Sequence, residues 1–519
     1  MQRVLAEWKL SGFPIGSVIL FVATYDEINA YVSGAGLDHA DYAICTSDPK
    51  YAAYGRGMHE MADAPVLFTT HVRAEKDMRA TGSFEAISAF FYKGRPRTLR
   101  VWDEGFAAAV GATFDLDELC ALSSAFKVLP AEERLLFNDL RQACITPTNG
   151  MSIPIPLAFV NAADRVLKRG LKGADGPKKA LEALAKLAGS TAYARDAGDG
   201  RWRFVGASRS LPADIGPLFV LDASARLTDR YDQLPAHGMK VVSLEPATID
   251  YRNLVVRICN LAAGKTALGN ETTRTKVFGI IADLANSKPD DSFLIVMAKD
   301  FCSKGEGDTV ALLNELAAKL KDSSKVRIIN WGRHKGSNQF RDVQNVVIVS
   351  SHAYTNEAYE AMALADGGRL DGIVGSEVVK RVRDNEFMQN LYQSVCRGNV
   401  RNQEGGICGH MNAYLIMSDS SERRNHIKLA FPGCMVEGWK PIAPTKQSKL
   451  DTAMRVLLEL LKDKISVSKK ELVAACGGSG SSYLTKICKD QRFIDFCKIH
   501  RILMLNNGFQ RYRSFEMAA

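Results

Sequence analysis

Long hydrophobic runs are absent from this sequence. The longest apolar stretch, residues 17–23, falls far short of the roughly 18 residues that a membrane-spanning helix needs. The first ten residues, MQRVLAEWKL, have helical spacing and lack the continuous apolar core of a secretory signal. We therefore expect a soluble, cytoplasmic protein without membrane contact.

Paired cysteines are also absent. The 11 cysteines are odd in number, scattered, and form no C-x-x-C pair. This pattern predicts reduced core residues rather than a disulfide framework. Cys408 and His410 are close in sequence, but no second ligand pair accompanies them, which argues against a structural zinc site.

The composition that remains is that of a globular protein with a basic end. The chain has 519 residues, 46% of them hydrophobic, and its length suggests two to four domains. The net charge is +9, and residues 440–519 hold 15 lysines and arginines against 7 acids, a local excess of +8. A basic terminal module suggests an anionic partner such as nucleic acid, although a solvated basic face explains the charge alone equally well.

The order of apolar segments predicts an α/β protein. Short buried strands separated by helical segments indicate a parallel sheet over residues 1–235, and a second α/β pattern runs over residues 236–442. Residues 106–215 are rich in alanine, leucine and lysine and predict a helical insertion in the first domain. The expected strands are residues 17–22, 43–45, 66–68, 99–102 and 217–221, then 293–297, 327–330, 346–349 and 413–417.

Beyond a linker at residues 443–448, the last 71 residues, 449–519, resemble a winged-helix domain. Three helices are expected, the second opened by a capping box at Ser468, and a hairpin is expected around Asn507-Gly508. In this interpretation the third helix faces DNA and two arginines lie near the wing; a small helical domain for protein contacts is the alternative. The residues of the helix are Ser482, Tyr483, Lys486 and Lys489, and those near the wing are Arg511 and Arg513.

Adjacent acids end the strand at residues 99–102. Asp103 and Glu104 are the residue types that nucleotide hydrolysis needs at this position, because one carboxylate holds Mg²⁺ and the other polarises the attacking water. Many strands end in exposed acids without any such role, so the pair is informative only together with other motifs.

Two loops add candidate residues. The turn Val220–Ala225 contains Asp222 and Ser224, small polar residues that allow two domains to approach closely. The segment Trp331–Asp342 brackets a basic run between two glycines, which suits phosphate binding through backbone N–H groups and cations. An ordinary turn and a glycine-rich surface loop are the simpler interpretations.

The fourth motif contains two closely spaced arginines. In a helix, Gln393, Arg397 and Arg401 would lie on one face at intervals of four residues. Two arginines on one face without an acid between them repel each other, so the pattern favours an anion such as a γ-phosphate opposite them.

In this order the four motifs resemble those of superfamily 2 helicases of the DEAD/DEAH-like group, of bacterial or phage type. The resemblance covers residues 1–402 and implies two RecA-like domains that bind ATP and Mg²⁺ between them. It implies that Asp103 holds Mg²⁺, that Glu104 handles water, and that Gln393 and the arginines complete the ATP site. It also implies two further groups of residues, one that contacts ATP or couples its hydrolysis to domain motion and one that contacts nucleic acid. The coupling residues would be Asp222, Ser224, Gly332, Gly336 and Asp342; the nucleic-acid contacts would be Thr24, Thr70, His71, Arg333, Lys335 and Asn338.

The chain departs from this family at its start. No G-x-x-x-x-G-K-[ST] phosphate loop precedes Asp103, and residues 1–9 resemble the helix that should follow the loop. Gly264-Lys265-Thr266 has the loop's ending, but Cys259 occupies the position of its first glycine, so we interpret it as an ordinary turn. An N-terminally truncated chain would bind ATP poorly, because the loop cradles the phosphates, and its first domain would be destabilised.

Two functions from different classes remain after this comparison. The first is an ATP-dependent nucleic-acid helicase or translocase acting on DNA, impaired by the missing phosphate loop. The second is a non-catalytic nucleic-acid-binding protein with a helicase-like scaffold. A transcriptional regulator built on the C-terminal domain makes little use of the preceding 440 or so residues.

Overall fold

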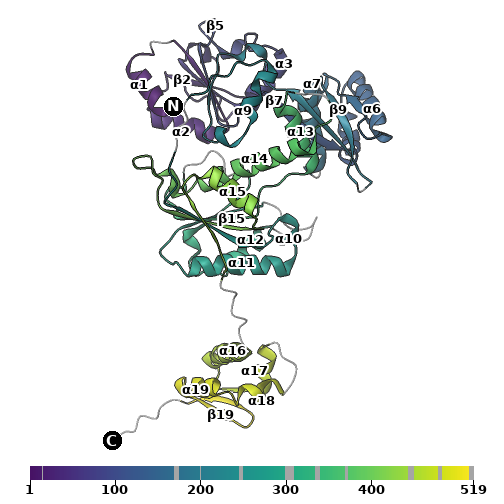
Figure 1. The fold of residues 1–519 in the computed structure, drawn as a ribbon. Helices are drawn as coiled ribbons and strands as arrows, with labels where there is room; N and C mark the ends of the chain where they lie inside the picture. The colour runs from purple at the N-terminus through teal and green to yellow at the C-terminus, as the bar shows by residue number, and fades with distance from the viewer. Residues whose placement is uncertain are drawn as a thin grey trace. The chain divides into compact units, whose positions relative to one another are not determined.

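The computed structural model describes residues 1–13, 16–168, 175–198, 200–244, 249–298, 309–332, 339–368, 372–441, 449–476 and 482–512 (Figure 1). The chain divides into two compact units. The larger comprises Met1–Arg274, Pro289–Leu313 and Asp322–Trp439, and the smaller comprises Thr275–Lys288, Asn314–Lys321 and Lys440–Ala519. Among the described residues, no helix has the length and apolar character required to cross a membrane.

The first sheet consists of five parallel strands in the order β11-β6-β1-β3-β2. The central strand β1 has the sequence VILFV and is buried along its whole length. Its odd and even residues enter two separate cores on the two faces of the sheet, which is why the strand is uniformly apolar. The strands are β1 (Val18–Val22), β2 (Tyr42–Cys45), β3 (Val66–Thr70), β6 (Leu99–Asp103) and β11 (Phe219–Leu221); the helices are α1 (Gln2–Leu10), α2 (Tyr25–Ala35), α3 (His71–Thr81) and α9 (Arg230–Gln233); a two-stranded hairpin is formed by β4 (Phe91–Tyr92) and β5 (Arg95–Pro96).

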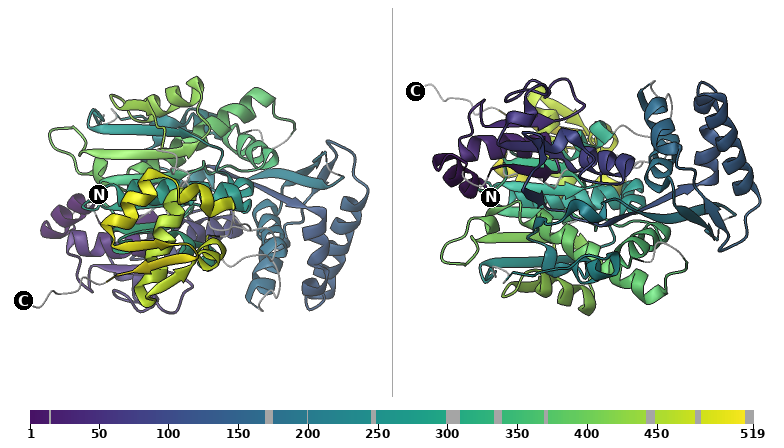
Figure 2. Two further views of the ribbon diagram at one scale, coloured as in Figure 1. Left: turned by 90° about the horizontal axis from the view of Figure 1, so that it is seen from below. Right: turned by 90° about the horizontal axis from the view of Figure 1, so that it is seen from above.

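The insertion is not purely helical, so that part of the sequence prediction was wrong. It contains a four-stranded antiparallel sheet in the order β7-β10-β9-β8, backed by helices, as Figure 2 shows in blue from two directions. Strand β9 has the sequence TAYARD and buries its two alanines; alanine is the strongest helix former, which concealed the two-residue period. The elements are β7 (Ala109–Asp115), α4 (Leu116–Ala121), α5 (Ser123–Phe126), α6 (Ala131–Ile145), β8 (Ser152–Pro154), α7 (Phe159–Lys168), α8 (Asp175–Leu187), β9 (Thr191–Asp196) and β10 (Trp202–Arg209).

The second sheet has six parallel strands in the order β14-β13-β15-β16-β12-β17. Strands β13 and β15 are buried at every position, as expected for strands covered on both faces. The prediction of two α/β domains built on parallel sheets is therefore confirmed. The elements are β12 (Leu254–Asn260), α10 (Lys265–Gly269), α11 (Glu271–Asn286), β13 (Phe293–Met297), α12 (Thr309–Ala317), β14 (Val326–Asn330), β15 (Asn345–Val349), α13 (Asn356–Asp366), α14 (Ser376–Val395), β16 (Met411–Met417), α15 (Ser421–Ala430) and β17 (Met435–Gly438).

Helix α13 packs against the sheet of the insertion. Small residues allow this close approach: a Cβ on Gly111 in β7 would lie 2.3 Å from the carbonyl oxygen of Ala361 in α13. Two ion pairs with mostly buried side chains flank the contact, Arg195 with Glu360 at 2.6 Å and Arg203 with Glu357 at 2.7 Å. The insertion thus adheres to the second parallel-sheet domain through both apolar packing and charge.

The C-terminal domain combines short helices with a three-stranded sheet in the order β18-β20-β19. The expected hairpin is present, but its turn is Asn506-Asn507, because Gly508 already pairs with Leu505. Gly508 is required for another reason: its Cβ would lie 2.5 Å from the carbonyl oxygen of Val467. The elements are α16 (Lys449–Asp463), β18 (Ser466–Ser468), α17 (Lys469–Ala475), α18 (Ser482–Ile487), α19 (Gln491–Ile499), β19 (Ile502–Leu505) and β20 (Gly508–Arg511); α19 was missed by the sequence analysis.

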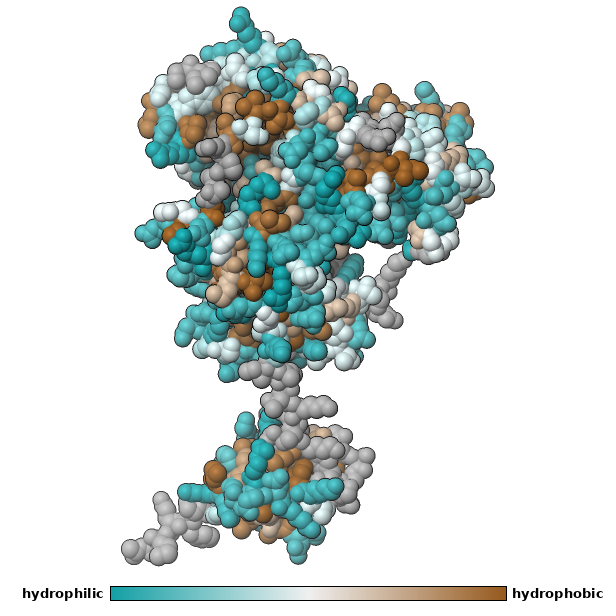
Figure 3. Space-filling model, viewed as in Figure 1, coloured by the Kyte–Doolittle hydropathy of each residue, from teal (hydrophilic) through white to brown (hydrophobic). Residues whose placement is uncertain are grey.

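The surface of this domain is partly apolar. Side chains that are large, hydrophobic and exposed come mainly from the end of α19 and from the hairpin: Ile465, Ile499, Leu503, Met504 and Leu505. Hydrophobic surface between hydrophilic patches is visible on the face that Figure 3 draws.

The contact between the insertion and α13 can be tested with one methyl group. We expect Gly111→Ala to lower the free energy of unfolding by about 1–3 kcal/mol, because the new Cβ meets backbone atoms that cannot move aside. Gly279→Ala is the control, since its Cβ would meet nothing within 4 Å and alanine favours a helix by about 0.5–1 kcal/mol. Denaturant unfolding of both variants measures the two effects, and equal stability of the two would contradict the prediction.

Candidate functional site

The predicted acidic pair lies at the carboxyl edge of the first sheet. Asp103 ends β6, and its Oδ2 accepts a 2.6 Å hydrogen bond from the Tyr31 hydroxyl. Glu104 follows with a φ of 59°, and Gly105 has a φ of 62°. Left-handed backbone is uncommon for glutamate and is concentrated at functional sites, where the surrounding structure imposes it.

Asp222 lies at the same sheet edge as this pair. Strand β11 pairs with β6 so that Leu221 lies opposite Asp103, which brings the following Asp222 to the same edge. Its Oδ1 accepts hydrogen bonds from the backbone N–H of Ser224 at 2.8 Å and from the Ser224 hydroxyl at 2.6 Å. Its Oδ2 accepts one from the Tyr231 hydroxyl at 2.6 Å. Ser224 therefore positions Asp222 through its own turn.

Burial raises the pKa of both Asp103 and Glu104, and the nearby charge of Asp222 raises them further. The charges that oppose this effect on Asp103 are the N-terminal amine and Arg401, and those that oppose it on Glu104 are Arg397 and Arg401. The motif after α14 thus lies near enough to the acids after β6 to act on their charge.

The geometry of the arginine motif differs from the prediction of one continuous helical face. Helix α14 ends at Val395, and Arg401 lies in a separate 3-10 turn, Asn399–Arg401. Gly398 explains the break, since a Cβ there would lie 2.4 Å from Met411 Sδ and 2.9 Å from Val346 Cγ2. The chain turns against the second sheet at this point, so the arginines are placed by tertiary packing.

Gln393 lies in the last turn of α14, four residues before Arg397. Its side-chain oxygen Oε1 is buried and accepts no hydrogen bond from any described residue. A buried oxygen without a donor is costly, which suits a position that receives a ligand or water.

Glu27 is a site residue that the sequence analysis missed. It occupies the first turn of α2, where its Oε2 accepts hydrogen bonds from the backbone N–H groups of Ala23 at 2.7 Å and Thr24 at 3.1 Å. Burial raises the pKa of Glu27 to about 7, with further contributions from Glu104 and Asp103. The signal that could have found it is the capping box T-Y-D-E directly after the strand β1.

The residues predicted to contact nucleic acid in this domain have structural partners. The hydroxyls of Thr24 and Thr70 cap α2 and α3 by accepting hydrogen bonds from the backbone of Glu27 and Arg73. His71 stacks in parallel on Trp102 at 4.5 Å, and burial lowers its pKa to about 4. The neutral ring therefore braces the strand that carries the acids, and a contact with nucleic acid stays a prediction.

The glycine-bracketed loop is only partly described. Gly332 lies in the turn after β14, which ends at Asn330, and has a φ of 94°; exposed Asp342 accepts a hydrogen bond from Asn402 Nδ2 at 3.3 Å. Because Asn402 directly follows Arg401, this bond joins the end of the loop to the end of the arginine motif. Four predicted site residues lie outside the described residues: Arg333, Lys335, Gly336 and Asn338.

In the C-terminal domain, Lys486 on α18, Lys489 after it and Arg511 on β20 are exposed. The side chain of Tyr483 and the whole of Arg513 lie outside the described residues. The exposed cations are available to a partner. In sequence, α19 lies between α18 and the hairpin of β19 and β20.

Comparison with known proteins gives similarity of fold only. No family model and no curated protein matches the chain. Among solved structures, Xpd4 of S. tokodaii is 11% identical, with a TM-score of 0.40, over 83% of this chain and 92% of that one. An XPD helicase is 10% identical, with a TM-score of 0.43, over 84% of this chain and 94% of the other. Dbp5 of S. cerevisiae, bound to RNA and ADP BeF3, is 10% identical, with a TM-score of 0.36, over 86% of this chain and 81% of the other.

One of these structural neighbours is named as a helicase, and one was solved with bound RNA. At sequence identities of 10–11%, these comparisons describe the course of the backbone and do not assign a role to any single residue. The roles of residues in this chain therefore rest on their own geometry.

The cluster has the chemistry to hold a hard divalent cation. Carboxylate oxygens are the ligands that Mg²⁺ prefers, and burial raises the pKa of Asp103 and Glu104, so a bound cation would favour their ionised forms. Asp103 accepts the Tyr31 hydrogen bond at Oδ2, so Oδ1 would be its ligand atom. Asp103 would hold the ion, which would neutralise phosphate charge.

The raised pKa of Glu27 predicts a dependence of stability on pH. The folded state binds this proton more tightly than the unfolded chain, whose pKa is near 4.5, so stability falls as the pH rises from about 4.5 to about 7. We expect Glu27→Gln, which stays neutral, to gain in melting temperature relative to the natural protein as the pH rises from 5 to 8. Asp26→Asn, which changes an exposed carboxylate in the same helix turn, is the control. A difference in melting temperature between Glu27→Gln and the natural protein that stays constant from pH 5 to pH 8 would contradict the prediction.

Proposed function

We propose that this chain is an ATP-dependent nucleic-acid helicase or translocase that acts on DNA. The observation that carries the proposal is the approach of Arg397 and Arg401, which follow α14 beside the second sheet, to Glu104, which follows β6 in the first. Opposite charges from two parallel-sheet domains are suited to a nucleotide whose phosphates and Mg²⁺ lie between them.

In this proposal each group acts on a separate part of the nucleotide. Asp103 binds Mg²⁺, which when bound would stabilise negative charge on the phosphates. Glu104 orients the attacking water, and the guanidinium groups of Arg397 and Arg401 stabilise the charge that develops on the γ-phosphate. Asp222, held by Ser224 and Tyr231, transmits the state of the site to β11.

The second candidate is a non-catalytic nucleic-acid-binding protein on the same scaffold. The sequence favours it at one point, because residues 1–102 contain no G-x-x-x-x-G-K-[ST] motif, and the phosphate contacts that such a loop makes are not assigned to any residue of this sequence.

ATP hydrolysis stimulated by DNA separates the two candidates. We expect Glu104→Gln to lower the rate by roughly 10²–10⁴, the range of a lost general base. Glu404→Gln, an exposed glutamate outside the cluster, is expected to keep the rate of the natural chain. Hydrolysis that survives Glu104→Gln contradicts the assigned role, and DNA binding without any hydrolysis favours the scaffold.

The C-terminal domain is proposed to bind DNA through its exposed cations. We expect Lys486→Ala and Lys489→Ala each to weaken binding to any DNA sequence and to reduce the slope of log affinity against log salt by about 1. Lys462→Ala, an exposed lysine of α16, is the control in the same domain. Fluorescence anisotropy at several salt concentrations measures the slope.

If the slope does not change in either variant, α18 does not contact DNA. Loss of affinity in Arg492→Ala, on the helix α19 that directly precedes the hairpin, would then assign the contact to α19. No effect in all three variants would favour a domain that contacts protein.

A further inference from the structure

A cavity of about 360 Å³ opens in the second parallel-sheet domain, and none of the residues that line it belongs to the cluster around Asp103. Its walls come from residues 351–354, which follow β15, from α13 and α14, and from the first half of α15 with its N-cap, which follow β16. The cavity thus lies outside the carboxyl ends of neighbouring parallel strands, where open α/β sheets hold their ligands.

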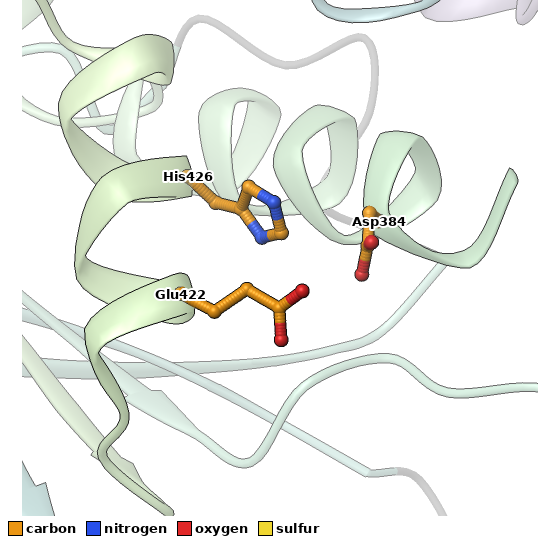
Figure 4. Close-up of side chains that lie close together, drawn as sticks. All are labelled: Asp384, Glu422 and His426. Atoms are coloured by element: carbon orange, nitrogen blue, oxygen red, sulfur yellow. The ribbon is translucent and has the colours of Figure 1, made fainter. Parts of the chain in front are cut away.

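Three potential metal ligands converge in this cavity. Asp384 extends from α14, and Glu422 and His426 extend from α15 toward it, as Figure 4 shows. Glu422 and His426 are four residues apart on one helix, so they lie on the same face one turn apart. One ligand atom from each of the three side chains lies within 4.8 Å of the others.

We propose that Asp384, Glu422 and His426 bind a divalent transition-metal ion of the Zn²⁺ or Mn²⁺ type. One imidazole nitrogen and two carboxylate oxygens form a mixed donor set that suits such ions. Bonds of about 2.1 Å place tetrahedral ligands about 3.4 Å apart, so binding requires the three side chains to move inward by about 1 Å. They are half-buried or exposed side chains at the cavity wall, which permits that movement.

The positive charges around the cavity are compatible with a cation. Lys380 pairs with Glu422 Oε1 at 2.9 Å, but its side chain is 53% exposed and Glu422 retains its second oxygen. Arg383 donates to Asn356 Oδ1 and lies over the Tyr359 ring. Arg423 donates to the Ser418 hydroxyl and lies over the Phe387 ring, so neither guanidinium pairs with the three ligands.

Three protein ligands leave at least one coordination position unfilled. The unfilled side faces the cavity, which has room for water or for an anionic oxygen ligand beside the ion. Sites with three protein ligands and an open position are those at which metals act on substrates, whereas structural zinc sites have four. The site would therefore present an accessible metal rather than only join α14 to α15.

The test is metal binding by the full chain, stripped with a chelator and kept free of nucleotide and DNA. Titration calorimetry with Zn²⁺ and with Mn²⁺, which avoids thiolates, is expected to show about one site that is weakened about tenfold or more in Asp384→Asn and in His426→Ala. His410→Ala, an exposed histidine outside the cavity, is the matched control. Lys380→Ala is expected to bind several-fold more tightly, since it releases Glu422.

Asp103→Asn separates this site from the proposed nucleotide site. A Mn²⁺ site that persists in Asp103→Asn and is lost in His426→Ala supports the cavity, whatever the outcome for ATP hydrolysis. Binding that persists in both Asp384→Asn and His426→Ala, or no stoichiometric binding by the natural chain at micromolar ion, overturns the proposal. Melting temperatures of the variants without metal verify that each is folded.

Discussion

Three carboxylates held close together constrain the rest of the site. The pairing of β11 with β6 brings Asp222 to the same edge as Asp103 and Glu104, and burial raises the pKa of the latter two. Such a group stays ionised only where hydrogen bonds and opposite charges compensate for lost solvation. Tyr31 and Tyr231 supply hydrogen bonds from the first domain, and the arginines after α14 supply charge.

The same constraint explains the residues on either side of the acids. Trp102 precedes the acids and is completely buried, with His71 stacked on its ring. The left-handed backbone at Glu104 redirects the chain directly after the strand, and its N–H donates to the carbonyl oxygen of Leu221 at 2.8 Å. A rigid support behind the acids and a tight turn after them together hold the carboxylates in one orientation.

The insertion adds a second connection between the parallel-sheet domains. Its strands β7 and β10 pack against α13 through alanine and glycine, and Arg195 and Arg203 pair there with glutamates of α13. Breaking such pairs leaves mostly buried charges without partners, which is more costly than losing exposed ones. Movement of one sheet relative to the other therefore has to preserve this contact or expose it to water.

The strands and their order along the chain could be predicted because each is a short apolar run, as in VILFV and FLIVM. The acids at the end of β6 were recognisable for the same reason, since a strand boundary is local. Helix α19 and the strands of the insertion were missed: alanine obscured β9, and the N-cap Asp490, which marks the start of the helix QRFIDFCKI, was not recognised. The continuous helix expected as far as Arg401 failed because a glycine packs there against Met411 and Val346, residues far away in sequence.

The sequence by itself determined the alternation of strands and helices, the acidic pair and the arginine motif, because these depend on neighbours within a few residues. Only the tertiary structure decided which of these groups meet. Glu27 joined the acids because α2 begins at the same sheet edge. Asp384 and His426 are 42 residues apart and became neighbours only because α14 packs against α15. Distances between side chains from separate elements follow from packing, which no local pattern encodes.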